Sequence, residues 1–112
     1  MQRDKAAYFW DISEAIRSIE DFVGDFDSVA YAENELLHSA VERKFEIIGE
    51  AVSQLAKHFP DTASQLPNYR QIIGFRNILI HGYADIDHAR GWDVIHKDVP
   101  SLKKAIESFA KL

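Results

Sequence analysis

Apolar side chains recur at spacings of three and four residues along most of this chain, which is the period of an amphipathic α-helix. A first apolar stripe covers residues 8–23 and predicts one helix of about 20 residues that ends at Gly24. A second stripe predicts a long helix from Asn34, or earlier, to His58, because the following Phe59–Pro60 pair disfavours its continuation. No segment alternates apolar and polar residues as a strand would, and no Asn-Gly hairpin turn is present. The chain is therefore predicted to be all-α.

The second half of the chain predicts shorter helices separated by turns. Residues 61–67 form a connector with room for one helical turn, and the helical pattern resumes over residues 68–82. A turn is expected at residues 84–87, followed by a helix that ends near Val99, and Pro100 is expected to begin the last helix. The sequence as a whole predicts an up-and-down bundle of four to five helices.

Length and composition suit one domain, over residues 1–112, with one core. No apolar run approaches the roughly 20 residues that span a bilayer. Charges interrupt the N-terminal string MQRDKAAYFWD too early for a signal peptide. Cysteine is absent, which excludes disulfides and thiolate metal sites. We therefore expect a cytoplasmic protein without membrane contact.

The formal net charge of −5 is unevenly distributed along the chain. Residues 1–50 carry a net charge of −7, and residues 51–112 carry a net charge of +2. Because affinity for phosphate comes from Lys and Arg, this acidity argues against DNA binding. A small positive site is still compatible with it, since Arg70 and Arg76 are the only formal charges within residues 67–83.

Two glycines lie inside predicted helices, in the similar strings EIIGEA and QIIGFR. Gly49 and Gly74 each cost a helix about 0.5–1 kcal/mol relative to alanine, so their presence needs a reason. One reason is a close crossing of two helices at each glycine. For Gly74, a second reason is that a partner backbone approaches beside Arg76.

The histidines of the second half do not predict a metal site. His81, His88 and His96 are seven and eight residues apart and would align only on one continuous helix. Glycines at positions 82 and 91 argue against such a helix. We therefore expect no bound metal.

A ladder of glutamates, Glu42, Glu46 and Glu50, is spaced by four residues on the long predicted helix. Such a ladder could bind a cation, but Arg43 and Lys44 lie beside it, and we interpret it as a solvated helix face. No glycine-rich phosphate loop and no nucleophile elbow is present in the sequence.

The string RNILIHGY, from Arg76 to Tyr83, places three chemically capable side chains in an otherwise apolar stretch. In one interpretation they form the rim of a helix: Arg76 pairs with a carboxylate, His81 caps the helix end, and Tyr83 packs on the core. In the other interpretation they perform phosphoryl chemistry. Histidine exchanges protons near neutral pH, and arginine offers a permanent planar cation to phosphate oxygens. His81 would then deprotonate the 2′-hydroxyl of RNA while Arg76 stabilises the transition state, without a metal.

Helical geometry limits how these side chains can meet. At roughly 100° per residue, Arg76 and Tyr83 lie within about 20° of each other around the helix axis. Arg76 and His81 lie about 140° apart, whereas Asn77 shares a face with His81. Arg76 can reach His81 if the helix unwinds at residues 80–82, or if two chains pair so that the arginine of one meets the histidine of the other. The second arrangement predicts a homodimer.

The blocks AVERKFEIIGEAVSQL and YRQIIGFRNILIHGY resemble the HepT family of HEPN-domain proteins, also described as DUF86. The resemblance extends over residues 5–111 and includes Trp92. The hallmark of the family, R-x4-H-x-Y, is matched without a gap by Arg76, His81 and Tyr83.

This resemblance implies a HEPN-type helical homodimer that acts as the RNase toxin of a type VII toxin–antitoxin pair. Arg76 and His81 would be catalytic in a cleft between the protomers, with Asn77 as a supporting polar residue. The antitoxin would be an MntA-like minimal nucleotidyltransferase, which silences such toxins by transferring AMP to the motif tyrosine, here Tyr83. The chain itself would need no cofactor, because the antitoxin uses the ATP. Since Tyr83 and Arg76 share a helical face, the added AMP would lie near Arg76 and block RNA.

The same resemblance leaves a second function open. HEPN domains also bind nucleotides or partners without cutting RNA, so the chain would then be a binding module of a nucleotidyltransferase complex. The acidic first half of the chain favours a protein partner over free RNA. Substitution of His81 separates the two functions, because only the catalytic one requires an imidazole. A bundle with a purely structural role is the third possibility.

Overall fold

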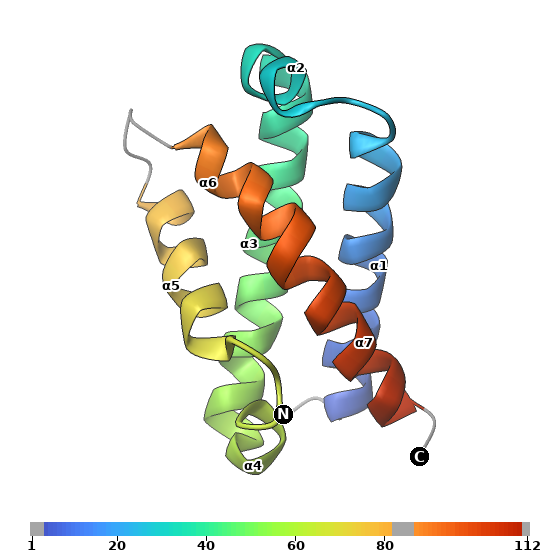
Figure 1. Cartoon of the computed structure of the whole chain (residues 1–112). Coiled ribbons are helices and arrows are strands. Elements are labelled where there is room, and N and C mark those ends of the chain that lie inside the picture. Colours follow the sequence, from blue (N-terminus) through green and yellow to red (C-terminus); the bar gives the residue numbers. More distant parts are fainter. Residues whose placement is uncertain (1–3, 82–86, 111–112) are drawn as a thin grey trace.

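The computed structural model describes residues 4–81 and 87–110 of the chain (Figure 1). Within these ranges the regular structure is entirely helical, as the apolar periodicity predicted. In chain order, the elements are α1 (Lys5–Val23), α2 (Ser28–Glu33), α3 (Glu35–His58), α4 (Pro60–Ala63), α5 (Tyr69–Ile80), α6 (His88–Asp93), a π-helical turn (Val94–Asp98) and α7 (Val99–Ala110).

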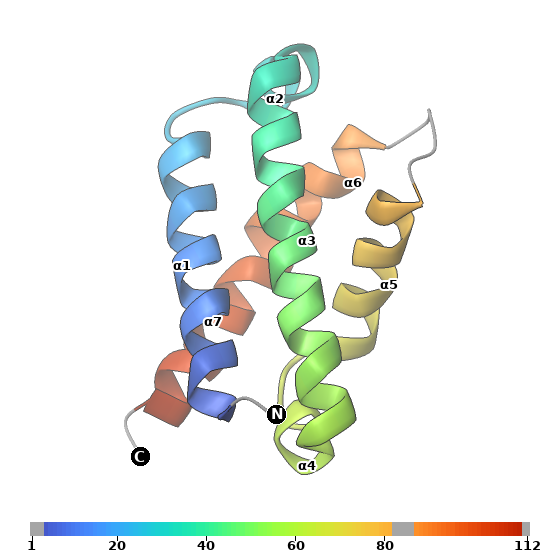
Figure 2. The ribbon, with the colours of Figure 1, turned by 180° about the vertical axis from the view of Figure 1, so that it is seen from behind.

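The helices form an up-and-down bundle. α1, α3 and α5 run side by side as antiparallel neighbours, with α3 in the middle (Figures 1 and 2). The continuous rod made by α6, the π-helical turn and α7 crosses one face of these helices diagonally. These four units are the main helices of the described chain, and α2 and α4 are short connections between them. The predicted all-α bundle is therefore confirmed.

Polar residues and one glycine set the helix ends. The side chains of Asp4, Asp27 and Asn34 accept hydrogen bonds from backbone N–H groups at the starts of α1, α2 and α3. Asp87 caps α6 in the same way. Gly24 ends α1 with a φ of +45°, a conformation that favours glycine.

The core is built from the apolar stripes that the sequence predicted. The largest fully buried side chains come from α1, α2, α3 and α7: Ile12, Ile16, Ile19, Tyr31, Val41, Val52, Leu55 and Leu102. α5 contributes Phe75 and Leu79 to the core but leaves Ile78 and Ile80 exposed, at 41% and 43%. α5 therefore packs on the bundle by one face and keeps apolar side chains on its outside.

The prediction that Pro100 begins the last helix is wrong. The rod continues through this position, and Pro100 is the second residue of α7. Proline lacks a backbone N–H, and its ring crowds the preceding helical turn. In the π-helical turn directly before it, the Val99 N–H donates to the Val94 carbonyl. This turn is wider than an α-helical one, so it accommodates the proline without a break.

The remaining predicted boundaries agree with the described residues. α3 ends at His58, α4 supplies the one helical turn expected in the connector, and α5 begins at Tyr69. The break expected at Gly82 and most of the turn expected at residues 84–87 lie outside the described residues. Within the described ranges, no helix combines the length and the apolar character needed to cross a membrane.

Candidate active site

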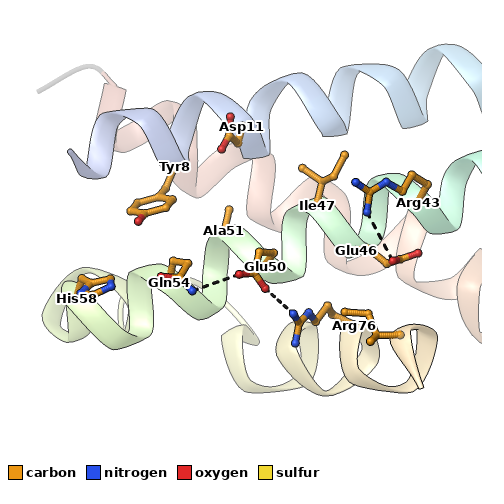
Figure 3. Close-up of a pocket in the computed structure, with 11 residues that line it drawn as sticks. Tyr8, Asp11, Arg43, Glu46, Ile47, Glu50, Ala51, Gln54, His58 and Arg76 are labelled. Atoms are coloured by element: carbon orange, nitrogen blue, oxygen red, sulfur yellow. Dashed lines mark hydrogen bonds and ion pairs between the residues drawn. The ribbon is translucent and has the colours of Figure 1, made fainter. Parts of the chain in front are cut away.

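A groove with a volume of about 680 Å³ lies where α1, α3 and α5 meet (Figure 3). α5 contributes Arg76 and Ile80 to its lining, and α1 contributes Tyr8 and Asp11. α3 contributes the rest: Arg43, Glu46, Ile47, Glu50, Ala51, Gln54 and His58. The motif arginine therefore lies in a concave, polar site made by segments that are far apart in the sequence.

Arg76 is held in this groove by polar contacts. Its Nη2 donates a short hydrogen bond to Oε2 of Glu50 on α3, and its Nη1 donates to Oδ1 of Asn77 at 2.8 Å. The Arg76 side chain is 26% exposed, and that of Glu50 is 50% exposed. The Nε atom of Arg76 is buried and has no hydrogen-bond partner among the described residues. Arg76 does pair with a carboxylate, as the rim interpretation expected, yet it keeps an unsatisfied donor.

The stem of Arg76 packs directly against Gly49. A Cβ added to Gly49 would lie 2.2 Å from Cβ and 2.6 Å from Cγ of Arg76, closer than real side-chain atoms approach. The close helix crossing predicted at Gly49 is therefore confirmed, and it places Arg76 at the groove. The same prediction is wrong for Gly74, because no atom of another described helix lies within 4 Å of a Cβ added there. Gly74 faces open space on α5.

Alanine at these two glycines should change stability in opposite directions. Gly49→Ala should lower the free energy of unfolding by about 1–3 kcal/mol, because overpacking must displace α5 or the Arg76 stem. Gly74→Ala should raise it by about 0.5–1 kcal/mol, because alanine favours a helix and the space is free. Urea unfolding of the two variants measures the difference. Equal shifts in the same direction would contradict the close crossing.

His81 lies on the helical path at the end of α5 and does not reach the groove. Its backbone N–H donates to the Asn77 carbonyl at 3.1 Å, and its φ and ψ are −75° and 4°. The helix therefore does not unwind before His81, and the angle of about 140° from Arg76 persists. His81 is exposed and is not among the residues that line the groove.

The structure thus brings together Arg76 and Asn77 of the predicted site residues, but it does not bring His81 to Arg76 within one chain. Asn77 contacts the guanidinium directly, which suits the supporting role expected for it. Tyr83, the expected modification site, lies outside the described residues.

The interpretation of the glutamate ladder as a solvated face is wrong for Glu42. Its side chain is 15% exposed and lies beside His38 and His88. The sequence did not predict this cluster, because His88 is brought to α3 only by the tertiary fold. The spacing of His38 and Glu42, four residues apart on one helix, was the available local signal.

Comparison with known proteins identifies the family. The family model described as "Ribonuclease HepT-like" matches residues 12–109. The chain is 36% identical over 106 residues to "Putative RNase MJ1380" of Methanocaldococcus jannaschii, which covers 95% of this chain and 96% of that protein. It is 33% identical over 111 residues to "Probable ribonuclease HepT" of Thermococcus cleftensis, which covers 99% of this chain and 100% of that protein. No solved structure shows significant similarity. The chain therefore belongs to the HepT-like ribonuclease family and has its helical fold.

Proposed function

We propose that this chain is the toxin of a HepT-type toxin–antitoxin pair, a ribonuclease that cleaves RNA in the cytoplasm without a metal ion. The observation that carries the proposal is the position of Arg76. In a chain of the HepT-like family, the motif arginine lies in a polar groove and keeps a buried, unsatisfied N–H. Such a guanidinium is suited to a phosphate oxygen, which accepts charge-assisted hydrogen bonds.

The proposed reaction needs only two side chains. The imidazole of His81 takes the proton of a ribose 2′-hydroxyl, and the resulting oxygen attacks the adjacent phosphorus. The bond from phosphorus to the 5′-oxygen of the next nucleotide breaks and that oxygen takes a proton from water, so the products are a 2′,3′-cyclic phosphate and a 5′-hydroxyl. Arg76 stabilises the extra negative charge on the phosphate during the attack. Phosphate binding requires Glu50 to release Arg76. The Glu50 carboxylate is half-exposed, so water can hydrate it instead and the loss of this ion pair costs little.

A homodimer supplies the missing contact between Arg76 and His81. Ile80 follows Arg76 by four residues, lines the groove and is 43% exposed. At roughly 100° per residue, Ile80 lies between Arg76 and His81 around the axis of α5. An exposed apolar side chain at this edge of the groove supports pairing with a second chain there. His81 of one protomer would then complete the groove of its partner.

The proposed antitoxin is an MntA-like minimal nucleotidyltransferase that transfers AMP from ATP to Tyr83. The added group carries a phosphodiester charge and a purine. That phosphodiester has the same charge and the same acceptor oxygens as the RNA backbone, so the modified tyrosine would compete with RNA for Arg76.

The groove also gives one reason to keep the binding-module alternative. Its lining includes Asp11, Glu46 and Glu50, and the two arginines there are paired with glutamates. Carboxylates repel RNA phosphates, so this charge pattern favours a protein or nucleotide partner if the groove is not catalytic.

One experiment tests both the activity and its control. The purified chain should cleave RNA in the presence of EDTA, and incubation with its nucleotidyltransferase partner and ATP should abolish cleavage. Tyr83→Phe should cleave RNA under both conditions, because it lacks the acceptor hydroxyl. Tyr69→Phe, on the same segment, is the matched control and should be silenced like the unmodified sequence. Absence of cleavage by the chain alone would overturn the proposal, and silencing of Tyr83→Phe would overturn its regulatory part.

A further inference from the structure

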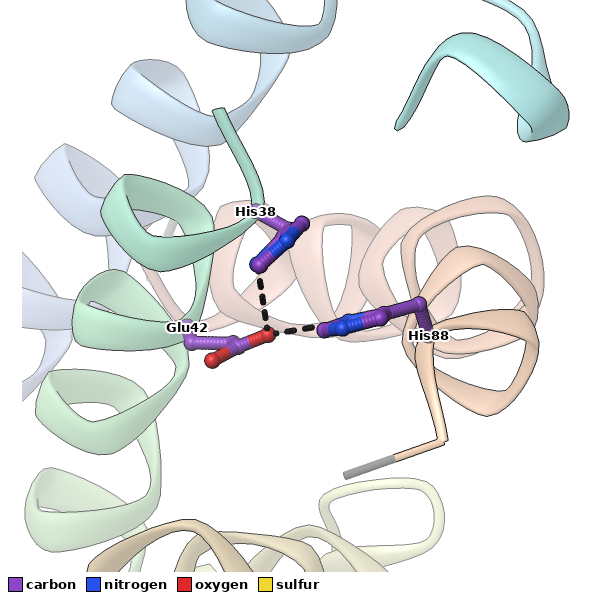
Figure 4. A group of neighbouring side chains, drawn as sticks. All are labelled: His38, Glu42 and His88. Carbon is purple, nitrogen blue, oxygen red and sulfur yellow. Dashed lines mark ion pairs between the residues drawn. The ribbon is translucent and has the colours of Figure 1, made fainter. Parts of the chain in front are cut away.

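Three potential metal ligands gather where α3 meets α6 (Figure 4). His38 and Glu42 are one turn apart on α3, and His88 is the first residue of α6. Nδ1 of His38 lies 3.5 Å from Oε2 of Glu42, and Nδ1 of His88 lies 3.3 Å from the same oxygen. The three ligand atoms lie within 4.8 Å of one another. Two imidazoles and a carboxylate therefore converge on one point from two helices.

These converging atoms are shielded from water and lack ordinary hydrogen bonds. The side chains of His38, Glu42 and His88 are 14%, 15% and 28% exposed. Each of the three ligand atoms is buried without a hydrogen-bond partner among the described residues. A charge-assisted N–H···O bond is about 2.7–2.9 Å long, so the two contacts are too long for good bonds of this kind. Buried polar atoms normally have a hydrogen-bond partner, so three polar atoms without one at the same point indicate a binding site for a further group.

The spacing of the ligand atoms suits a zinc ion. Bonds of about 2.0–2.2 Å and tetrahedral angles place neighbouring ligand atoms roughly 3.3–3.5 Å apart. The two distances to the Glu42 oxygen agree with this spacing. The rings of His38 and His88 stack with centroids 3.8 Å apart, so both imidazoles approach the same point. Imidazole nitrogen is a common zinc ligand.

Tyr31 on α2 is an independent sign of a missing group. Its side chain is fully buried, and its hydroxyl has no hydrogen-bond partner among the described residues. Its ring lies edge-on to both imidazoles, with centroids 6.2 Å from His38 and 6.4 Å from His88. A hydroxyl both donates and accepts, so a bound water would give it a partner.

We propose that His38, Glu42 and His88 bind one divalent transition-metal ion, with Zn²⁺ the best suited. Two imidazoles and one carboxylate are a common zinc ligand set that leaves the fourth position to water. The ion links α6 to α3 and stabilises the bundle. Glu42 precedes Glu50 by eight residues, about 12 Å along α3, so the metal site is separate from the Arg76 groove. The site is independent of the proposed RNA cleavage, and it differs from the expectation of no bound metal.

Metal binding by the chelator-stripped, full-length chain tests this site. Zn²⁺ at a hundredfold excess over its dissociation constant should raise the melting temperature by roughly 10 °C, since it binds only the folded chain. Co²⁺ should produce the visible absorption band of a tetrahedral site, with one ion bound per chain. X-ray absorption by the zinc-loaded chain should show two imidazoles and oxygen ligands, a measurement that requires no variant.

Three variants locate the ion. His88→Ala and Glu42→Gln should lose both the melting shift and the Co²⁺ band. His96→Ala removes an exposed histidine of the same rod and should keep both. The proposal is overturned if the unmodified chain gives no band, if absorption shows fewer than two imidazoles, or if both ligand variants bind Zn²⁺ like the control.

Discussion

Replacing His81 by alanine should reduce RNA cleavage by about 10²- to 10⁴-fold, the range that a positioned general acid–base contributes. The physical reason is the loss of the only imidazole in the motif that can accept the 2′-hydroxyl proton. The fold should be retained, because His81 is exposed and its backbone hydrogen bond to Asn77 does not depend on the side chain. Initial rates on a fluorogenic RNA, with a melting curve for each protein, measure the two effects separately.

His96→Ala is the matched control for this substitution. His96 is also an exposed histidine on a helix, and its Nδ1 lies 2.9 Å from the Trp92 carbonyl, away from the motif. The control should cleave RNA at the rate of the unmodified chain. If His81→Ala also cleaves at that rate while the chain is active, His81 is not the base. If the unmodified chain has no activity and both variants still bind the partner, the binding-module function is correct.

The helices of this bundle were predictable because their signals are local. The stripes of apolar residues over 8–23 and 37–55 act within a few residues, so spacing alone predicts α1 and α3. The start of the last helix was not predictable from the sequence, because a proline is compatible with two local backbone structures. Pro100 can begin a helix, or a π-helical turn before it can absorb its ring, and the packing of the rod across the bundle selects the second.

The candidate site was predictable only in the part that one helix determines. The angle between Arg76 and His81 follows from the helical period, and α5 keeps that angle through His81. The partner of Arg76 was not predictable, because Glu50 comes from another helix and depends on how closely α3 and α5 approach. Gly49 and Gly74 show the same limit. Their sequence contexts are nearly identical, and only the fold decides that Gly49 meets Arg76 while Gly74 faces open space.

The cluster of His38, Glu42 and His88 fails to appear in the sequence for a related reason. In the sequence His88 is closest to His81 and His96, but the fold places it beside two residues that come at least 46 positions earlier. Tertiary contacts between distant helices create both the groove and this cluster, so they share no local motif. The site chemistry of this chain therefore depends on helix crossings more than on any single helix.

Mixing two inactive variants should restore activity if the site is formed by two chains. Arg76→Ala and His81→Ala, each purified as a homodimer, should be inactive, because every site lacks one of the two side chains. In a heterodimer of the two variants, one site receives Arg76 from one chain and His81 from the other, and the second site lacks both. The isolated heterodimer should therefore cleave RNA at about half the rate of the unmodified dimer, since two-fold symmetry makes two equivalent sites.

Two different affinity tags and a tandem purification from co-expressing cells isolate this heterodimer from both homodimers. The same tags on two copies of His81→Ala give the matched control, which should stay inactive. Arg76→Ala is expected to fold, because the ion pair that it breaks involves a half-exposed carboxylate and contributes little to stability. An inactive heterodimer would place both side chains in one chain or exclude them from catalysis. Failure to recover any doubly tagged species would show that the chain does not dimerise, and the shared site would then be wrong. A single chain would not replace it, because α5 holds Arg76 and His81 about 140° apart.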